Sequence, residues 1–412
     1  MSDKIKVLEN GITLICHTNR RSKIGEIAVG VRVGSINENE KRLHGISHVL
    51  EHMFFKGTTS RTYKEINESI ENTGAETNAF TDYDKTCFYI TSKMTDFDDM
   101  AEILFDMFCN PSFPEEELEK EKEVIRQELM MYEDDPDSKS CMLSNEVSFK
   151  GSPMEHDIGG TWETVNALTV EDLRQYRKEN YTANRIFVSA FGNVTMEHLE
   201  DLVRKYMTNI QPSKEYVPVK IKTSYGNSNT TRRDISQAHV VWTVADFNRT
   251  KPEAYKMALF NEIFSNGMSS KLFMRIREEM GLVYTISSAI QPYGKNANMG
   301  IFALCDEDKI DVIKENIDLL IEEMKAGKFS DKEFLKAKNS QEIDIMKNDL
   351  APLGYAMKNL CSLISLGRLR NSKHNLKIIQ SITKEDLIEF ANKMFKKEKF
   401  NFAAVLPENS ND

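Results

Sequence analysis

Three polar residues at helical spacing give the first indication of chemistry in this chain. His48, Glu51 and His52 follow one another at steps of three and one, which places all three on one face of a helix. Two neutral imidazoles one turn apart can both reach a tetrahedral zinc ion at about 2.0–2.1 Å, leaving room for a third ligand and a water molecule. A carboxylate beside the open position can take a proton from zinc-bound water and pass it to a departing amine. We therefore expect His48 and His52 to bind zinc and Glu51 to act as the general base.

The competing interpretation is a buried helix whose histidines are satisfied by backbone or carboxylate partners, which is the usual situation for a lone histidine. With 8 histidines in 412 residues, a chance HxxEH is expected on the order of 0.02 times per chain, and the pattern is a metallopeptidase signature. Its apolar flanks would also make an unpartnered polar trio costly to bury. His44 lies one turn earlier, but a His44/His48 pair would leave His52 and Glu51 without a role. We therefore interpret His44 as a local structural residue.

A third ligand must come from elsewhere, and the acidic helix expected over Pro114–Tyr132 offers many carboxylates. Most of them point outward, as on a solvated charged face. Two glutamates, Glu121 and Glu128, instead share a stripe with apolar residues at steps of three and four. Metal coordination by one and orientation of a ligating histidine by the other would explain inward carboxylates. The spacing alone does not rank Glu121 against Glu128.

Internal similarity divides the chain into two halves. The segment 168–191 is echoed by the segment 382–405. More loosely, an acidic helix over 117–136 matches one over 333–352.

Between the two similar segments, residues 210–233 are rich in turn-forming residues, a composition typical of an interdomain linker. We expect a catalytic zinc-binding half at 1–212, a linker at 213–233, and a homologous noncatalytic half at 234–412 that completes the substrate site.

Within each half, strand-like runs alternate with long amphipathic helices. Strands followed by helices, rather than strict βαβα alternation, predict an α+β fold. We expect two homologous α/β-sandwich halves, each a mostly antiparallel sheet packed against helices. In the first half we expect strands at Glu26–Val33 and Thr86–Thr91, and helices at Tyr63–Asn72, Asp96–Cys109 and Pro114–Tyr132.

Composition excludes several other classes of protein. Hydrophobic residues make up 40% and charged residues 29%, and no stretch approaches 18 consecutive apolar residues, so we expect no membrane span. A net charge of -10 argues against nucleic-acid binding. The six cysteines are scattered without CxxC spacing, which indicates reduced core thiols. The N-terminus has no apolar signal region, so we expect a cytoplasmic protein.

At this point the motifs match a known family. The run Gly45–Thr58 resembles the signature of the pitrilysin and mitochondrial processing peptidase family, in its short, two-domain bacterial type. The segment Glu121–Glu128 resembles the family's ExxxxxxE element. The resemblance implies one zinc ion per chain, with Glu128 as the third ligand beside His48 and His52. It also implies that Glu121 orients a ligating histidine from behind.

Two further segments correspond to elements of the family. Gly74–Thr81 resembles its edge strand near the zinc, where backbone groups around Asn78 and Ala79 align the substrate as an added β-strand. Without the resemblance, this segment reads as an ordinary strand after a turn. Arg277–Tyr284 is similar to an Arg-x6-Tyr element, which implies that Tyr284 assists at the scissile carbonyl and that Arg277 contacts substrate. On spacing alone, an exposed arginine and a core tyrosine are commonplace.

The resemblance covers essentially the whole chain and implies a zinc metalloendopeptidase that cleaves peptides or unfolded segments inside a closed chamber. The family builds that chamber from four such halves, so a homodimer or a heterodimer with a related chain is implied, and Arg277 and Tyr284 are expected to act from the partner subunit. The second half has no zinc motif, and residues 264–270 lack the long glycine-rich loop of the noncatalytic mitochondrial subunit, which argues against a presequence-specific role. The alternative is a catalytically silent zinc-bound structural or binding subunit.

Overall fold

Strands from the first half of the chain form a six-stranded sheet in the order β1-β2-β6-β3-β5-β4 in the computed structural model, which describes residues 3–208, 210, 216–350 and 354–408. The pairs are antiparallel except for β2 with β6. The strands are β1 (Lys4–Val7), β2 (Thr13–Thr18), β3 (Ile24–Val31), β4 (Glu76–Thr81), β5 (Thr86–Lys93) and β6 (Ile186–Gly192).

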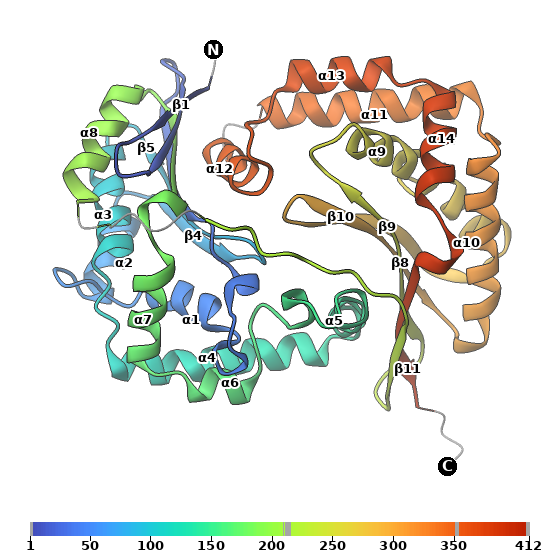
Figure 1. Cartoon of the computed structure of the whole chain (residues 1–412), viewed down its shortest axis with the longest axis horizontal. Coiled ribbons are helices and arrows are strands. Elements are labelled where there is room, and N and C mark those ends of the chain that lie inside the picture. Colours follow the sequence, from blue (N-terminus) through green and yellow to red (C-terminus); the bar gives the residue numbers. More distant parts are fainter. Residues whose placement is uncertain (1–2, 209, 211–215, 351–353, 409–412) are drawn as a thin grey trace. The chain divides into compact units, whose positions relative to one another are not determined.

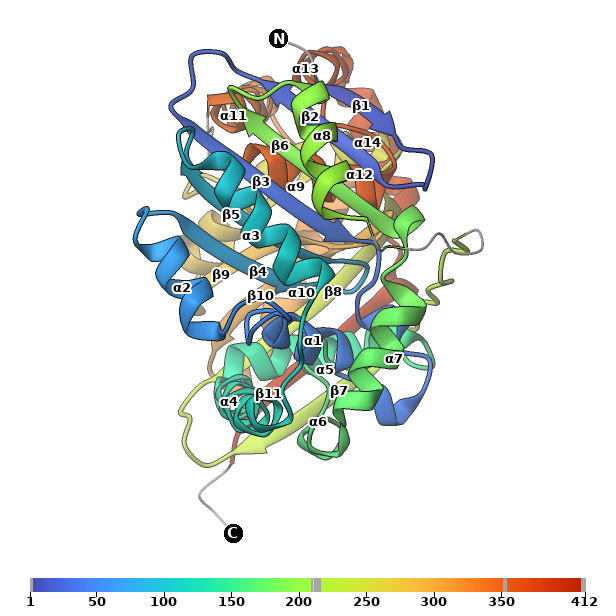
Figure 2. The same cartoon turned by 90° about the vertical axis from the view of Figure 1, so that its left-hand side faces the viewer.

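Helices cover both faces of this sheet. Figure 2 shows α3 (Phe97–Cys109) and α8 (Met196–Tyr206) crossing one face. The other face packs against α12 (Tyr355–Leu366), through an apolar cluster that includes Ala28 and Leu360. The remaining helices of this unit are α1 (Ile46–Met53), α2 (Tyr63–Glu71), α6 (Trp162–Ala167), α7 (Val170–Asn180) and α4 (Glu115–Asp134) as far as residue 130.

A second sheet has the order β7-β11-β8-β10-β9, again antiparallel except for one pair, β11 with β7. Its strands are β7 (Asn227–Arg232), β8 (Ala238–Asn248), β9 (Val283–Tyr293), β10 (Asn296–Cys305) and β11 (Phe400–Pro407). Its helices are α5 (Pro136–Ser148), α9 (Glu253–Phe264), α10 (Ile310–Lys325), α11 (Asp331–Leu350), α13 (Ser372–Ser381) and α14 (Lys384–Met394), with a π-helical segment, η5, at Phe273–Glu279. Two mostly antiparallel sheets packed against helices confirm the predicted α+β fold.

The internal repeat corresponds to matching local structures. Thr169 caps α7 by accepting from the Asp172 N–H, and Thr383 caps α14 from Asp386 in the same way. Each capped helix leads into a strand of its own sheet, β6 in one case and β11 in the other. Reciprocal caps of this kind define where a helix begins. The two repeated segments therefore have the same local structure, and residues 351–352 of the second acidic segment lie outside the described residues.

The compact units differ from the contiguous halves expected at 1–212 and 234–412. The first unit takes residues 1–130, 156–220 and 351–370, and the second takes the remainder. Helix α5 packs against β8 and β11, whereas α12 packs against β3 and β6. The colours of Figure 1 show that α5 comes from the first half of the sequence and α12 from the second.

Within the expected linker at 213–233, residues 213–215 lie outside the described residues, while 227–232 form β7. This strand is ordered by pairing with β11, a long-range contact that turn-rich composition does not reveal.

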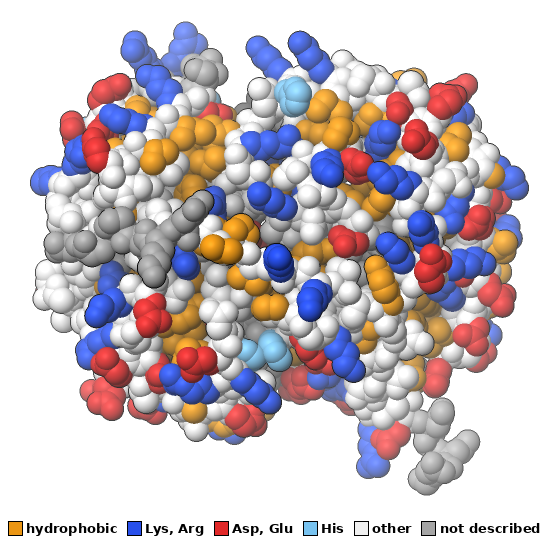
Figure 3. All heavy atoms as spheres, in the orientation of Figure 1, with side chains coloured by type: hydrophobic (Ala, Val, Ile, Leu, Met, Phe, Trp, Pro, Cys, Tyr) orange, Lys and Arg blue, Asp and Glu red, His pale blue; other side chains and the backbone are white. Residues whose placement is uncertain are grey.

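In the described part of the chain, no helix combines the length and the apolar character needed to cross a membrane. Lysine, arginine, aspartate and glutamate side chains are interspersed over the face seen in Figure 3. Although the net charge of the chain is -10, that face carries both positive and negative side chains.

Candidate metal centre

Helix α1, which carries the HxxEH motif, begins at a tightly constrained turn. Gly45 has φ +93°, and a Cβ there would lie 2.5 Å from the carbonyl oxygen of Gly159, so glycine is required at the start of the helix. The buried carboxylate of Glu38 accepts from the N–H groups of Gly45 at 2.8 Å and Ser47 at 2.9 Å. Burial raises the pKa of Glu38 to about 7, although these two hydrogen bonds act in the opposite direction. The helix start is thus fixed by one carboxylate and one glycine.

The apolar face of α1 is buried in the core of the first unit, through Ile46, Val49, Leu50 and Met53. The opposite face presents the polar trio. His48 Nε2 lies 3.6 Å and His52 Nε2 lies 3.7 Å from Glu128 Oε2, and the three ligand atoms all lie within 4.8 Å of one another.

These distances fit a tetrahedral zinc ion, since ligand atoms about 2.05 Å from a common centre are separated by roughly 3.3 Å. Two imidazoles and one carboxylate are also a donor set that zinc accepts in catalytic sites. Of the two acids left open by spacing, Glu128 is the one that lies near Nε2 of both histidines, and His44 is not in the group. The His44 ring instead lies against the His156 ring in a tilted arrangement, with the ring centroids 4.0 Å apart.

The first histidine is held in its neutral form. Burial lowers the pKa of His48 to about 4, and the neighbouring His52 adds to the effect. A neutral imidazole is the form that binds a metal. His48 Nδ1 is buried and has no hydrogen-bond partner among the described residues. It faces Gly159, where a Cβ would lie 3.7 Å away.

The second histidine is held by a carboxylate behind it. His52 Nδ1 donates to Glu121 Oε2 at 3.0 Å, and Lys56 Nζ lies 2.5 Å from Glu121 Oε1. Burial raises the pKa of Glu121, but the hydrogen bonds from His52 and Lys56 outweigh it, so the net pKa is lowered. An ionised Glu121 fixes the His52 tautomer with Nε2 free to bind. The role of Lys56 was not predicted from the sequence. Its position one turn beyond His52 is the only sequence signal that could have indicated this contact.

Glu51, the expected base, is held from the edge of the sheet. Thr81 Oγ1 donates to Glu51 Oε2 at 2.7 Å. Burial raises the pKa of Glu51, and the Thr81 hydrogen bond and the charge of His52 oppose that rise. Thr81 is the last residue of β4, and only a contact across the fold could reveal its role. The same strand is an edge of the sheet and contains Asn78 and Ala79, with the Ala79 N–H donating to Asn78 Oδ1 at 2.8 Å.

Arg277 and Tyr284 belong to the second unit. The Arg277 guanidinium lies 4.6 Å from the ring centroid of Phe273 and 5.8 Å from that of Tyr284. Tyr284 is 74% exposed, so it is not the core tyrosine that composition alone would suggest. The structure brings these two residues together, and their part at the metal centre stays a prediction.

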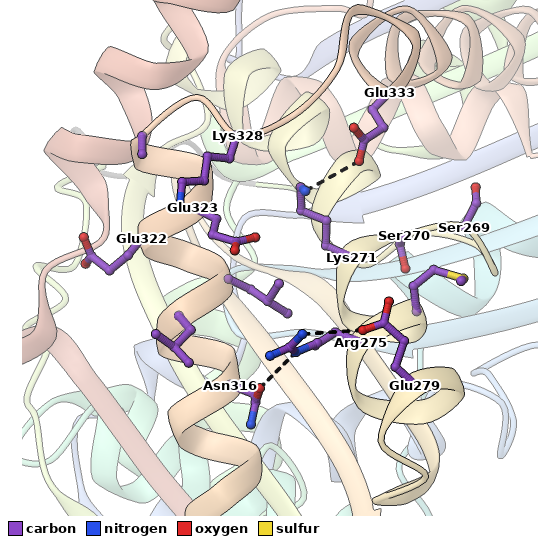
Figure 4. Close-up of a pocket in the computed structure, with 14 residues that line it drawn as sticks. Ser269, Ser270, Lys271, Arg275, Glu279, Asn316, Glu322, Glu323, Lys328 and Glu333 are labelled. Atoms are coloured by element: carbon purple, nitrogen blue, oxygen red, sulfur yellow. Dashed lines mark hydrogen bonds and ion pairs between the residues drawn. The ribbon is translucent and has the colours of Figure 1, made fainter.

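A cavity of about 620 Å³ opens beside α10 and η5 in the second unit (Figure 4). It mixes cations such as Arg275 with acids such as Glu333, and Arg275 donates to Asn316 Oδ1 at 3.2 Å. None of the residues expected to carry the chemistry lines this cavity.

An HxxEH helix that meets a distal glutamate is the arrangement typical of metallopeptidases of the inverted-motif class. Residues 14–161 match the family model described as "Insulinase (Peptidase family M16)", and residues 167–341 match "Peptidase M16 inactive domain". The chain belongs to the M16 peptidase family, which includes the insulinases and pitrilysins. The resemblance seen in the sequence motifs is thereby confirmed.

The chain is similar to relatives and to solved structures over nearly its full length. The chain is 26% identical over 400 residues to the uncharacterised zinc protease YmxG of Bacillus subtilis, covering 97% of each chain. It is 28% identical over 397 residues to an uncharacterised zinc protease of Rickettsia felis, covering 95% and 94%. A protease from Helicobacter pylori has the same fold at a TM-score of 0.89 and 19% identity, covering 98% and 99%. A chain of complex III2 from Candida albicans has a TM-score of 0.83 at 15% identity, covering 98% and 95%.

Proposed function

We propose that this protein is a zinc-dependent endopeptidase in which His48, His52 and Glu128 hold one zinc ion and Glu51 is the general base. The observation that carries the proposal is the meeting of His48 Nε2, His52 Nε2 and Glu128 Oε2 within 4.8 Å. Relatives that are named zinc proteases support the choice of metal.

The residues of this chain supply orientation and proton transfer. When bound, zinc supplies Lewis acidity, which makes water a better nucleophile at neutral pH and polarises a carbonyl. The Glu51 carboxylate takes the proton of the attacking water and returns it to the leaving amine. Glu121 keeps His52 in the tautomer whose Nε2 faces Glu128. Tyr284 stabilises the developing oxyanion, and Arg277 contacts the substrate.

The proposed substrate is an extended peptide or an unfolded segment that adds as a strand to the β4 edge, beside Asn78 and Ala79. Strand addition uses main-chain hydrogen bonds and therefore tolerates many sequences. The β4 edge ends at Thr81, which contacts Glu51, so a strand bound there would run toward the base. We further propose that two chains, identical or related, pair to form a closed chamber.

The test of the base is Glu51→Gln. The substitution keeps the size of the side chain but removes its basicity, so zinc content should be unchanged while peptide hydrolysis falls by about 10³-fold or more. Metal content and product formation from a diverse peptide library are measured on the same sample. Undiminished hydrolysis would remove Glu51 from the mechanism.

Chelation tests the metal in the same assay. Cleavage should stop when zinc is removed and return when it is restored. A wild-type sample that binds zinc and cleaves no peptide in the library would instead support a silent structural subunit.

A further inference from the structure

Two thiols meet where α12 packs on the sheet of the first unit. Cys87 lies on β5 and Cys361 on α12, and each thiol influences the pKa of the other. Both belong to the apolar cluster between the helix and the sheet. The approach is close, because a Cβ added at Gly30 would collide with the Leu360 side chain and lie 3.2 Å from Cys87 Sγ.

The surroundings of the two thiols are unequal. Cys87 is fully buried at 0% exposure, whereas Cys361 is half-buried. Burial raises the pKa of the Cys87 thiol well above its usual value. The neighbouring Cys87 thiol lowers the pKa of Cys361, and the charge of Lys85 acts in the same direction against the effect of burial. A thiol that is partly exposed and more readily ionised is the one an oxidant reaches first.

We propose that Cys87 and Cys361 form a disulfide when the protein meets hydrogen peroxide, which links α12 covalently to β5. The Cys361 thiolate attacks the O–O bond of peroxide, giving a sulfenic acid and hydroxide, which takes up the thiol proton as water. The Cys87 thiol then displaces a second water from that sulfur and forms the S–S bond. Two thiols lose two electrons and two protons, and one peroxide becomes two waters.

The link would act on a helix that is already anchored at its first turn. The buried Glu26 carboxylate accepts from the Ala356 and Met357 N–H groups at 3.2 Å each. This contact holds one end of α12 reversibly, whereas a disulfide at Cys361 would hold its middle until it is reduced. Because α12 comes from the second half of the sequence, the bond would also join the two halves of the chain.

Peroxide treatment of the full-length protein, followed by non-reducing digestion and mass spectrometry, tests the proposal. We expect a linked pair of peptides containing Cys87 and Cys361 that separates on reduction. Amide hydrogen exchange across α12 should slow by about tenfold or more in the oxidised protein. If both thiols stay free in excess peroxide, or if Cys361 links to a different cysteine, the proposal is overturned. A correct link with unchanged exchange would overturn the locking of α12.

Single variants separate the roles of the two thiols. In Cys87→Ser, oxidation should stop at the Cys361 sulfenic acid, which dimedone traps, whereas Cys361→Ser should leave Cys87 reduced. A dimedone adduct on Cys87 in Cys361→Ser would overturn the assigned order of attack. The matched control is Cys141→Ser on α5, which should form the same link as the wild type. The wild-type peptide map requires no variant and does not depend on peptidase activity.

Discussion

At the scale of single residues, two of the side chains expected to work at the metal centre, His52 and Glu51, are held by others that would not touch substrate. His52 is held by Glu121, which is held in turn by Lys56, and Glu51 is held by Thr81. Such supports fix tautomer and orientation before a ligand arrives. Their removal should leave the fold intact and change one property of the site at a time.

Thr81→Val removes the hydroxyl that orients Glu51 while keeping a branched side chain. One hydrogen bond to a charged group is worth about 1.5 kcal/mol or more, so kcat should fall by about tenfold while KM and zinc content stay near the wild-type values. Steady-state kinetics on a defined peptide measure the effect. Thr81→Ser keeps the hydroxyl and should recover most of the rate; equal losses in both variants would contradict an orienting role.

Glu121→Gln removes the charge behind His52. Losing a carboxylate that supports a ligating histidine typically weakens metal binding by about 10–100-fold, so competition with a chelator should show a weaker zinc affinity. Glu116→Gln on the same helix is the matched control, because the Glu116 side chain is 84% exposed and pairs only with Lys120 among the described residues. If both variants hold zinc alike, Glu121 has no supporting role.

At the scale of elements, the site depends on how helices begin and where a sheet ends. Helix α1 starts at Gly45 under the Glu38 carboxylate, and β4 ends at the residue that contacts Glu51. The expected helices at 63–72 and 96–109 agree with α2 and α3 to within a residue, because their amphipathic period is local information.

The cap on α1 predicts a dependence of stability on pH. The pKa of Glu38 rises from 4.5 to about 7 on folding, so between these values the folded state binds the proton that the unfolded state has released. Stability contributed by Glu38 is therefore full below pH 4.5 and is lost as pH rises toward 7, by up to about 3 kcal/mol. Urea unfolding of wild type and Glu38→Gln across this range measures it. A difference between the two proteins that does not change with pH would contradict the assignment.

Other elements could not be placed from the sequence. Helices α5 and α12 each belong to the unit that is formed mainly by the other half of the sequence. A periodic apolar stripe shows that a helix has a buried face, but it does not show which sheet that face packs against. Thr81 and Glu51 lie on two different elements, so no periodic spacing within one element predicts their contact. By contrast, the HxxEH helix and the inward stripe containing Glu121 and Glu128 were visible because each is periodic within one helix.

At the scale of the whole molecule, the residues proposed to take part in catalysis are divided between the two units of the chain, and the proposed chamber requires two chains. The first unit contains His48, His52, Glu128 and Glu51, and the second contains Arg277 and Tyr284. Subunit exchange can determine whether Tyr284 acts with Glu51 of its own chain or with Glu51 of the partner subunit.

Mixing Glu51→Gln with Tyr284→Phe distinguishes the two arrangements. If Tyr284 acts in the partner subunit of a homodimer, random exchange makes half of the dimers mixed, each with one intact site, and about a quarter of wild-type activity should return. If Tyr284 acts within its own chain, every site keeps one defect and no activity returns. Native mass spectrometry confirms that subunits have exchanged.

The exchanged helix α12 also affects how the chain is made. The sheet face that it covers is apolar, with Ile15, Ala28, Cys87 and Phe187 all buried against it. During translation these residues emerge long before residues 355–366 do, so the nascent first half must leave that face bare until the ribosome has nearly finished. A fragment ending near residue 220 should therefore expose this apolar surface and be prone to aggregation and to capture by chaperones, even though it contains every proposed zinc ligand.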